Sequence, residues 1–352
     1  MRIKPMLAAL PLCMLFFATT SSALTPTEQL GKNIFFDTNL SEPAGQACSS
    51  CHDPAFGFAD PDQNLPVSEG VIPGRFGGRN SPPAAYASFS PLFTLSGGVQ
   101  GGQFWDGRAK DLAAQARGPF LNPVEMNNTS KRQVLEKILA SVYAGQFTQV
   151  CGTVNLNNAA SVDAAYVCMS ETIAAFETTS ELNKFSSKFD AYMAGTATLT
   201  AQEELGRQLF GGRGKCAHCH DDNGSRNVPA LFTDFKYHNI GIPKNPEFPI
   251  TNNPVDLGLG GPTGGHPNDA GDKGKFKTSH LRNIAKTGPY MHNGVFKTLK
   301  EVVHFYNTRD LPGIWPAPEY PDTVSGNFLG DLNLTDAEED ALVAFMMTFT
   351  DQ

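Results

Sequence analysis

The chain has 352 residues, a formal net charge of −8 at pH 7, and 34 glycines with 25 prolines. Its basic residues form no clustered run, which argues against nucleic acid as a partner. The length exceeds what one hydrophobic core usually supports, so we expect two domains, with many loops around short helices.

Residues 1–23 have the features of an export signal. Arg2 and Lys4 precede an apolar run at residues 6–18, and the small residues at 21–23 offer a cleavage site. The run is too short for a membrane span, and no later stretch approaches the roughly 20 apolar residues that a bilayer-crossing helix needs. We therefore expect a cleaved signal peptide and a periplasmic protein with no membrane span.

An internal repeat follows the signal. The stretch "LTPTEQLGKNIFF" from Leu24 matches "LTAQEELGRQLFG" from Leu199, and "FWDGRAKDL" from Phe104 matches "MHNGVFKTL" from Met291. Each copy of the first stretch begins with a capping box, a threonine followed three residues later by glutamate, which predicts the start of a helix. The chain is therefore predicted to consist of two homologous, mainly α-helical domains.

The boundary between these domains is expected in the helical stretch from Ser161 to Gly195. The predicted domains are residues 24–185 and residues 186–352. Further capping boxes that begin at Thr298 and Thr335 predict two helices in the second domain. Strand signals are sparse, and the remaining Gly- and Pro-rich segments predict loops.

Each predicted domain carries one Cys-x-x-Cys-His motif. The two motifs are Cys48, Cys51 and His52, and Cys216, Cys219 and His220. Two thiols at this spacing can each form a thioether with a haem vinyl group, and the histidine then binds the iron. A redox dithiol would not explain the histidine in both motifs, and a zinc site would require the motifs to converge.

We therefore expect two covalently bound haems c, one in each cytochrome c-like domain. His52 and His220 would be the proximal iron ligands, and His218 inside the second motif would be a bystander. Of the cysteines outside the motifs, Cys151 and Cys168 remain after signal cleavage. In an oxidising compartment they can form a disulfide, and the alternative is a pair of free buried thiols.

The second ligand of the second iron is left open by these patterns. The candidates are Met291, His292, His304 and Tyr306. On the helix predicted after Thr298, Tyr306 shares one face with apolar residues, whereas His304 points elsewhere. Tyr306 would therefore face either the haem or the core, and Met291 would be the conventional ligand of a high-potential haem.

The chain resembles the bacterial dihaem cytochrome c peroxidase and MauG family over nearly the whole mature sequence. The resemblance rests on both haem motifs and on the stretches "GRNSPP", "QFWDGRAKDLAAQARGPFLNPVEM", "LRNIAKTGPYMHNG" and "TLKEVVHFYN". It implies a first haem that reacts with hydrogen peroxide and a second, six-coordinate haem that relays electrons.

Two departures from the peroxidase branch favour the MauG and MbnH type. Peroxidases of the family have a histidine that caps the first haem where this chain has Val71, and no histidine lies between His52 and His218. Tyr306 stands where peroxidases have the methionine ligand of the second haem. By resemblance Tyr306 is therefore the expected second ligand of that iron, and its phenolate would stabilise higher oxidation states.

The resemblance also assigns roles in peroxide chemistry. Trp105 would lie between the haems and couple them. Glu125 would be the distal acid and base that assists cleavage of the O–O bond. Gln115 and Pro119 would be its neighbours in the distal pocket.

A calcium ion between the haems is a further implication. Asn80 and the carbonyl oxygens of Thr287 and Pro289 would bind it, and oxygen ligands suit this hard cation. Thr287 precedes Tyr306 by 19 residues, which is the family's interval between these two ligands.

The implied activity is oxidation by hydrogen peroxide through a high-valent, bis-Fe(IV)-type state. An exported partner protein would dock near the second haem domain and be oxidised at long range, with a tryptophan as the expected target and a quinone or kynurenine as the product. Trp315 in that domain is either a surface relay or a packed loop residue. The alternatives are peroxide reduction with electrons from a small cytochrome or cupredoxin, and a dihaem electron carrier without enzymatic activity.

Overall fold

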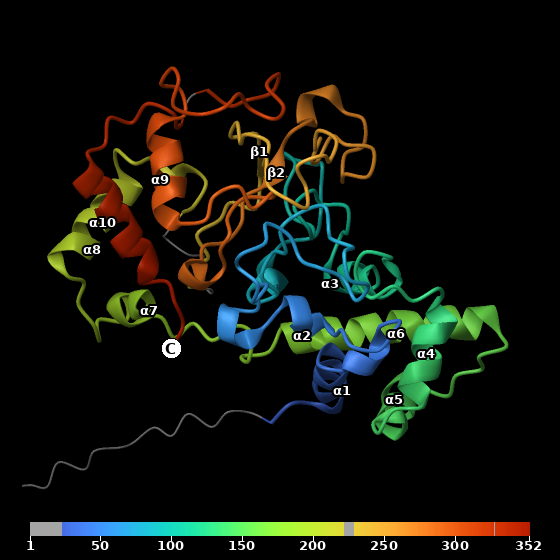
Figure 1. The fold of residues 1–352 in the computed structure, drawn as a ribbon. Coiled ribbons are helices and arrows are strands. Elements are labelled where there is room, and N and C mark those ends of the chain that lie inside the picture. Colours follow the sequence, from blue (N-terminus) through green and yellow to red (C-terminus); the bar gives the residue numbers. More distant parts are fainter. Residues whose placement is uncertain (1–22, 222–228, 327) are drawn as a thin grey trace, which may run out of the picture.

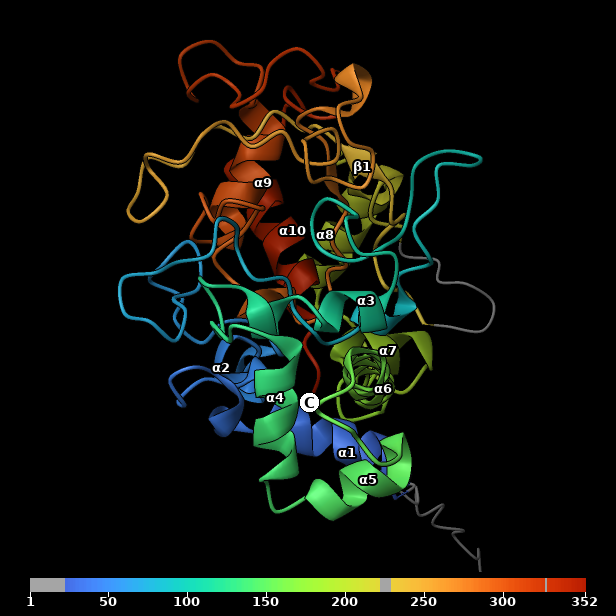
Figure 2. The ribbon, with the colours of Figure 1, turned by 90° about the vertical axis from the view of Figure 1, so that its right-hand side faces the viewer.

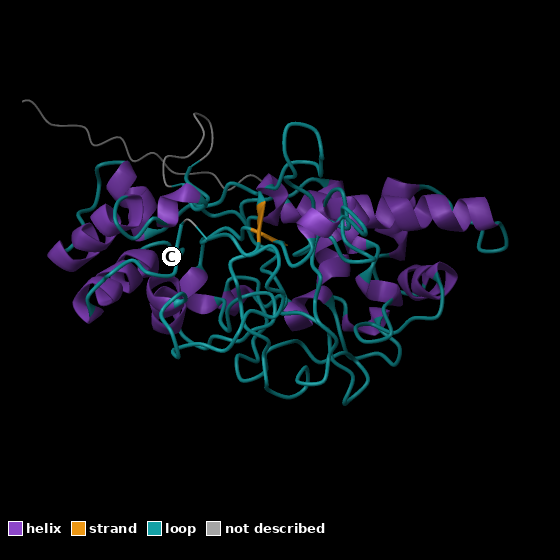
Figure 3. Ribbon diagram, turned by 90° about the horizontal axis from the view of Figure 1, so that it is seen from above, coloured by secondary structure: helices purple, strands orange, loops and turns teal. Residues whose placement is uncertain are grey.

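The computed structural model describes residues 23–221, 229–326 and 328–352, so nearly all of the expected signal peptide lies outside the described residues. Helices gather at two ends of the molecule and long loops lie between them (Figure 3). The predicted helix-rich fold with few strands is confirmed. No helix in the described ranges is both long enough and apolar enough to cross a membrane.

The elements follow one another in this order along the chain. The α-helices are α1 (Pro26–Phe35), α2 (Cys48–Cys51), α3 (Leu112–Ala116), α4 (Lys131–Leu139), α5 (Ala144–Cys151), α6 (Ala159–Glu177), α7 (Lys188–Met193), α8 (Ala201–Gly211), α9 (Leu299–Thr308) and α10 (Asp336–Met347). The 3₁₀ helices are η1 (Thr38–Leu40), η2 (Pro54–Phe56), η3 (Ala87–Phe89), η4 (Pro119–Leu121), η5 (Cys216–His218), η6 (Ala270–Asp272) and η7 (Ile284–Lys286). The strands β1 (Tyr237–His238) and β2 (Phe276–Lys277) form an antiparallel pair, with Tyr237 opposite Lys277.

All four predicted capping boxes are present. Thr25, Thr200, Thr298 and Thr335 each accept a hydrogen bond from the main chain three residues later, and the glutamate there bonds back to the threonine N–H. These reciprocal bonds satisfy main-chain donors that the first helical turn leaves free. They fix the starts of α1, α8, α9 and α10 at the residues that the sequence indicated.

Two helix pairs cross at equivalent glycines of the repeat. Helix α1 packs on α6, and α8 packs on α10 (Figures 1 and 2). A Cβ atom on Gly31 would lie 1.9 Å from the carbonyl oxygen of Thr172, and one on Gly206 would lie 1.9 Å from that of Ala341. Only glycine allows such close backbone contact, so the same sequence feature sets the same helix crossing in both halves.

The second correspondence of the repeat is also a repeat of backbone structure. Bridges join Gln103 to Ala109 and Tyr290 to Phe296, at matching positions of the two stretches. Phe104 (φ 63°) and its counterpart Met291 (φ 73°) both lie in the left-handed region. Non-glycine residues adopt this conformation rarely, so the two loops share an uncommon turn.

The helical stretch expected from Ser161 to Gly195 is two helices, α6 and α7. The hydroxyls of Thr178 and Thr179 donate to the carbonyl oxygens of the preceding turn at 2.7 and 2.8 Å, which ends α6. Ser187 then caps α7 in a new capping box. The separate hydrophobic clusters of residues 30–182 and 189–349 flank this break, while the division at residues 185 and 186 stays a prediction.

Cys151 and Cys168 form a disulfide that joins the end of α5 to α6. This confirms the pairing expected from the cysteine count. The four cysteines of the two motifs are not in disulfides and remain available as thiols.

Candidate active site

Both Cys-x-x-Cys-His motifs form a short helical turn that ends at the histidine. The first motif is α2 and the second lies in and after η5. In each turn the main-chain N–H of the histidine donates to the carbonyl oxygen of the first cysteine, at 3.0 Å for His52 and 2.9 Å for His220. The turn places both thiols and the imidazole on one short segment, as covalent haem attachment requires.

The two histidines are oriented in the same way. Nδ1 of His52 lies 3.1 Å from the carbonyl oxygen of Phe58, and Nδ1 of His220 lies 2.7 Å from that of Phe232. A carbonyl can only accept, so Nδ1 carries the proton and Nε2 is the free lone pair, the arrangement that second-sphere carbonyls impose on metal-binding histidines. Burial lowers the pKa of both imidazoles and keeps them neutral, the form that binds iron.

A large cavity opens beside the second motif. Its lining includes Cys216, Cys219 and His220 of the motif and Tyr306 from α9. The predicted apolar face of α9 lines the same cavity with Leu299, Val302 and Val303. Two thiols, an imidazole with a free Nε2 and an apolar wall are the groups that a covalently attached porphyrin needs, so the residues present fit a haem c.

Tyr306 is the expected second ligand at this cavity. Burial, and next the nearby thiols of Cys219 and Cys216, raise the pKa of its phenol well above the ordinary value. The buried phenol is therefore neutral by itself. A cation at the cavity centre would be needed to hold the phenolate, which is consistent with an iron-binding role.

The other candidate ligands have different surroundings. Nδ1 of His304 is bonded to Glu339 at 3.0 Å, so this side chain points away from the cavity, as predicted. His292 lines the cavity, but its ring stacks on Phe276 with 3.6 Å between centroids. Met291 also lies in the wall.

Trp105 and Asn80 lie together in the wall of the same cavity. The indole N–H of Trp105 donates to the main-chain oxygen of Asn80 at 2.8 Å, and the Asn80 amide donates to the carbonyl oxygen of Pro66 at 3.2 Å. Thr287 and Pro289 line this cavity too. Within the described ranges their carbonyl oxygens accept no hydrogen bond, so these neutral oxygens fit a hard cation.

Glu125 lies beside the first motif. Burial is the main reason that the pKa values of the Cys48 and Cys51 thiols are raised, and the nearby negative charge of Glu125 raises them further. The Glu125 carboxyl accepts a hydrogen bond from Asn122 at 2.7 Å, and burial raises its pKa. The main-chain N–H of Val71 donates to the Glu125 carbonyl oxygen at 2.9 Å.

The two expected neighbours of Glu125 lie on the same segment. Gln115 belongs to α3, and Pro119 begins η4. The carbonyl oxygen of Pro119 accepts the N–H of Met126 at 3.2 Å, which folds the segment back on itself next to Glu125. The local turns thus bring Pro119 and Glu125 together, while in the described part of the chain the Gln115 side chain forms no hydrogen bond with either.

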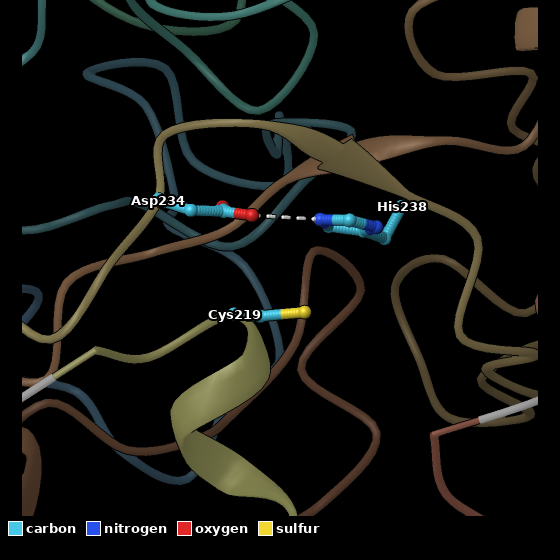
Figure 4. A group of neighbouring side chains, drawn as sticks. All are labelled: Cys219, Asp234 and His238. Atoms are coloured by element: carbon cyan, nitrogen blue, oxygen red, sulfur yellow. Dashed lines mark hydrogen bonds and ion pairs between the residues drawn. The ribbon is translucent and has the colours of Figure 1, made fainter.

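Sequence reasoning missed two polar residues beside the second motif. His238 forms an ion pair with Asp234 at 3.1 Å, next to the Cys219 thiol (Figure 4). This hydrogen bond to Asp234 is the main reason that the pKa of His238 is raised to about 9. Cys219, Asp234 and His238 lie close enough together to hold a metal, but Cys219 is one of the two cysteines expected to attach the second haem. Only the pattern of two polar residues four apart could have drawn attention to Asp234 and His238.

Two buried basic side chains in the cavity wall were also missed. Burial lowers the pKa of Lys277 to about 8 and that of His280 to about 4. Both lie in the segment that begins with β2. Neither has a sequence signal, because their burial depends on loops from the other half of the chain.

Comparison with known proteins identifies the family. The model of the family described as di-haem cytochrome c peroxidase matches residues 25–198. The methylamine utilization protein MauG of Paracoccus denitrificans is 37% identical over an alignment of 346 residues that covers 92% of this chain and 88% of that protein. The cytochrome c551 peroxidase of Nitrosomonas europaea is 36% identical over 288 residues, covering 80% and 74% of the two chains.

A solved structure agrees with these relatives. The diheme peroxidase BthA from Burkholderia thailandensis superposes with a TM-score of 0.84 at 35% identity, covering 94% of this chain and 87% of that chain. The family model matches the first half of the chain. The alignments with MauG and with the BthA structure also include the second half. The chain therefore belongs to the di-haem cytochrome c peroxidase and MauG family and is a haem-dependent oxidoreductase of the peroxidase type.

Proposed function

We propose that this protein is a periplasmic dihaem enzyme that uses hydrogen peroxide to oxidise a partner protein at long range, at a tryptophan. The observation that carries this proposal is Tyr306 in the cavity of the second motif, together with Val71 bonded beside Glu125. The phenol of Tyr306 at the second haem site and the apolar side chain of Val71 at the first suit an enzyme that reacts with peroxide before any reduction.

The haems would supply the redox chemistry, with one in each of the proposed domains, residues 24–185 and 186–352. His52 and His220 would bind the irons through Nε2, since Nδ1 of each is committed to a carbonyl oxygen. The apolar wall around the second site would exclude water from it.

Glu125 would move the proton during peroxide cleavage. Burial raises its pKa, so its carboxyl group holds a proton more readily than an exposed glutamate does, and it would deliver that proton to the departing oxygen. Asn122 fixes the carboxyl through the 2.7 Å hydrogen bond. The Val71 side chain cannot bind a metal, so this side of the first site stays open to peroxide.

Trp105 would couple the two sites, because it lies in the cavity wall and is anchored to Asn80 by its N–H. A calcium ion held by Asn80 and the carbonyl oxygens of Thr287 and Pro289 would keep this segment rigid. The partner protein would dock at the second domain, on the side where Trp315 lies.

The rival function is peroxide reduction with electrons from a small cytochrome or cupredoxin, as the peroxidase relatives suggest by name. Optical and EPR spectroscopy of the diferric protein, before and after one equivalent of hydrogen peroxide, separates the two. A high-spin and low-spin ferric pair that reacts without prior reduction supports our proposal. Two low-spin haems that react only after half-reduction would favour the peroxidase.

A further inference from the structure

Tyr86 is fully buried, and its hydroxyl group is bonded to a carboxylate. The hydroxyl donates to Oδ2 of Asp351 at 2.7 Å and accepts the main-chain N–H of Phe185 at 2.9 Å. The Asp351 carboxylate also accepts hydrogen bonds from Asn283 and Ser186, at 2.9 and 3.0 Å. A phenol inside the protein therefore has a firmly held base at hydrogen-bond distance.

The main chain connects Tyr86 to the first haem site. The N–H of Ala84 donates at 2.9 Å to the carbonyl oxygen of Phe58, the same atom that orients Nδ1 of His52. Tyr86 follows two residues later and belongs to the hydrophobic cluster against which Cys48 packs. The phenol is thus close to the segment that carries the proximal histidine.

A single aromatic ring separates Tyr86 from the second cavity. The ring of His280, which lines that cavity, meets the Tyr86 ring edge to face with 5.7 Å between centroids. Asn283, which bonds Asp351, also touches the first half, because a Cβ on Gly57 would lie 2.8 Å from its Cβ. The pair of Tyr86 and Asp351 therefore sits where the two haem sites approach each other.

We propose that Tyr86 is an oxidisable residue of this enzyme and that Asp351 is its proton acceptor. One electron leaves the phenol for the centre that peroxide has oxidised, the phenolic O–H bond breaks, and the proton forms a new O–H bond on the Asp351 carboxylate. A neutral tyrosyl radical remains, and one of the two oxidising equivalents of the peroxide has been used. Tyr86 thus serves as an internal electron donor when no partner protein is bound.

The coupling of electron and proton follows from burial. A phenol in an apolar interior loses an electron readily only if its proton leaves with it, since a buried phenol cation would be uncompensated. Burial also raises the pKa of Tyr86 far above its ordinary value, so the resting side chain is neutral. Asp351 is the base that makes the joint transfer possible. The proposal rests on the peroxide reaction of the family and not on the identity of the partner.

The chain contains a matched control. Tyr143 donates to Oδ2 of Asp37 at 2.5 Å, so it has the same phenol and carboxylate pairing. It lies just before α5, and α5 lies at the opposite end of the molecule from α8, α9 and α10 (Figure 1). If pairing alone produced a radical, Tyr143 would do so as readily as Tyr86.

The test is freeze-quench EPR of the holoenzyme after one equivalent of hydrogen peroxide, with ring-deuterated tyrosine as the label. We expect an organic radical whose EPR signal narrows when the tyrosine rings are deuterated. This radical should be absent in Tyr86→Phe and present in Tyr143→Phe. Asp351→Asn, which can still accept the hydrogen bond but not the proton, should lower the radical yield and slow its formation.

A radical that persists unchanged in Tyr86→Phe, or that is narrowed only by labelled tryptophan, overturns the proposal. So does an enzyme whose haem spectrum responds to peroxide while no tyrosyl radical forms, an outcome that leaves the proposed function intact. If Tyr86→Phe fails to incorporate haem, difluorotyrosine placed at residue 86 keeps the hydroxyl group. Fluorine splitting in the radical then assigns it to Tyr86, and its absence rules Tyr86 out.

Discussion

The main-chain N–H of Val71 donates a 2.9 Å hydrogen bond to the main-chain carbonyl oxygen of Glu125. The adjacent residue is held as tightly, since a Cβ on Gly70 would lie 2.4 Å from the carbonyl oxygen of Val124. The side chain at position 71 is therefore carried by a segment fixed next to the proposed distal acid. This relationship makes residue 71 a direct test of how the first site is gated.

Replacement of Val71 by histidine should convert the resting enzyme to a peroxidase-like state. An imidazole beside Glu125 would offer a second ligand to the first iron, so we expect the high-spin ferric EPR signal to fall and the direct reaction with peroxide to slow. Val71→Leu keeps an apolar side chain and should retain both. A Val71→His protein that is still high-spin and fully reactive would show that residue 71 does not face the iron.

Replacement of Glu125 by glutamine should slow the reaction with peroxide by about 10²–10⁴-fold, the usual contribution of a positioned general acid and base. The amide oxygen can still accept the hydrogen bond from Asn122, so haem content and folding should not change. Stopped-flow absorbance after peroxide mixing measures the rate. The control is Glu69→Gln, which removes a carboxyl group from the neighbouring loop and should react with peroxide at the wild-type rate. If Glu69→Gln slowed the reaction as much as Glu125→Gln, the result would argue against a specific role for Glu125.

Replacement of Tyr306 by phenylalanine should remove the proposed oxygen ligand of the second iron while keeping the ring. We expect the low-spin ferric EPR signal of the second haem to be replaced by a high-spin one. The peroxide-generated state should then decay faster, because the charge of the phenolate no longer stabilises it. The control is Tyr290, which lines the same cavity and whose hydroxyl donates to the carbonyl oxygen of Ile284 at 2.9 Å, so Tyr290→Phe should leave both properties unchanged.

Replacement of Gly206 by alanine should destabilise the fold by about 3 kcal/mol, at the upper end of ordinary overpacking. Its Cβ would lie 1.9 Å from a carbonyl oxygen of α10, so the two helices must separate. Gly211→Ala, in the last position of the same helix and with no atom within 4 Å, should change stability by less than about 1 kcal/mol. Chemical denaturation of both variants, followed by circular dichroism, makes the comparison.

Replacement of Glu177 by glutamine should flatten the dependence of stability on pH. Burial raises the pKa of this carboxyl to about 8, so the folded state holds a proton that the unfolded state releases above a pH of about 4.5. The contribution of Glu177 to the free energy of unfolding is therefore largest at acidic pH. It declines by roughly 2–4 kcal/mol as the pH rises to about 8. Denaturation of wild type and Glu177→Gln from pH 4.5 to 8.5 measures it. Exposed Glu136→Gln should follow the wild type.

The sequence by itself determined the features that neighbouring residues set. The two Cys-x-x-Cys-His motifs, the capping boxes of α1, α8, α9 and α10, and the repeat were readable because each depends on spacings of a few residues. Helical periodicity also predicted that Tyr306 shares the apolar face of its helix and that His304 points elsewhere, as the cavity lining and the bond to Glu339 confirm. The roles of Glu125, Trp105 and the calcium ligands came from family resemblance and remain predictions.

Tertiary structure alone decided what long loops bring together. The bond between Val71 and Glu125 joins segments more than 50 residues apart, and that between Tyr86 and Asp351 spans 265 residues. Tyr86 itself has the uncommon left-handed backbone conformation (φ 62°), and its hydroxyl meets a carboxylate from the far end of the chain. No local pattern encodes these contacts, because their free energy comes from burial and hydrogen bonds that exist only once distant segments of the chain have folded together.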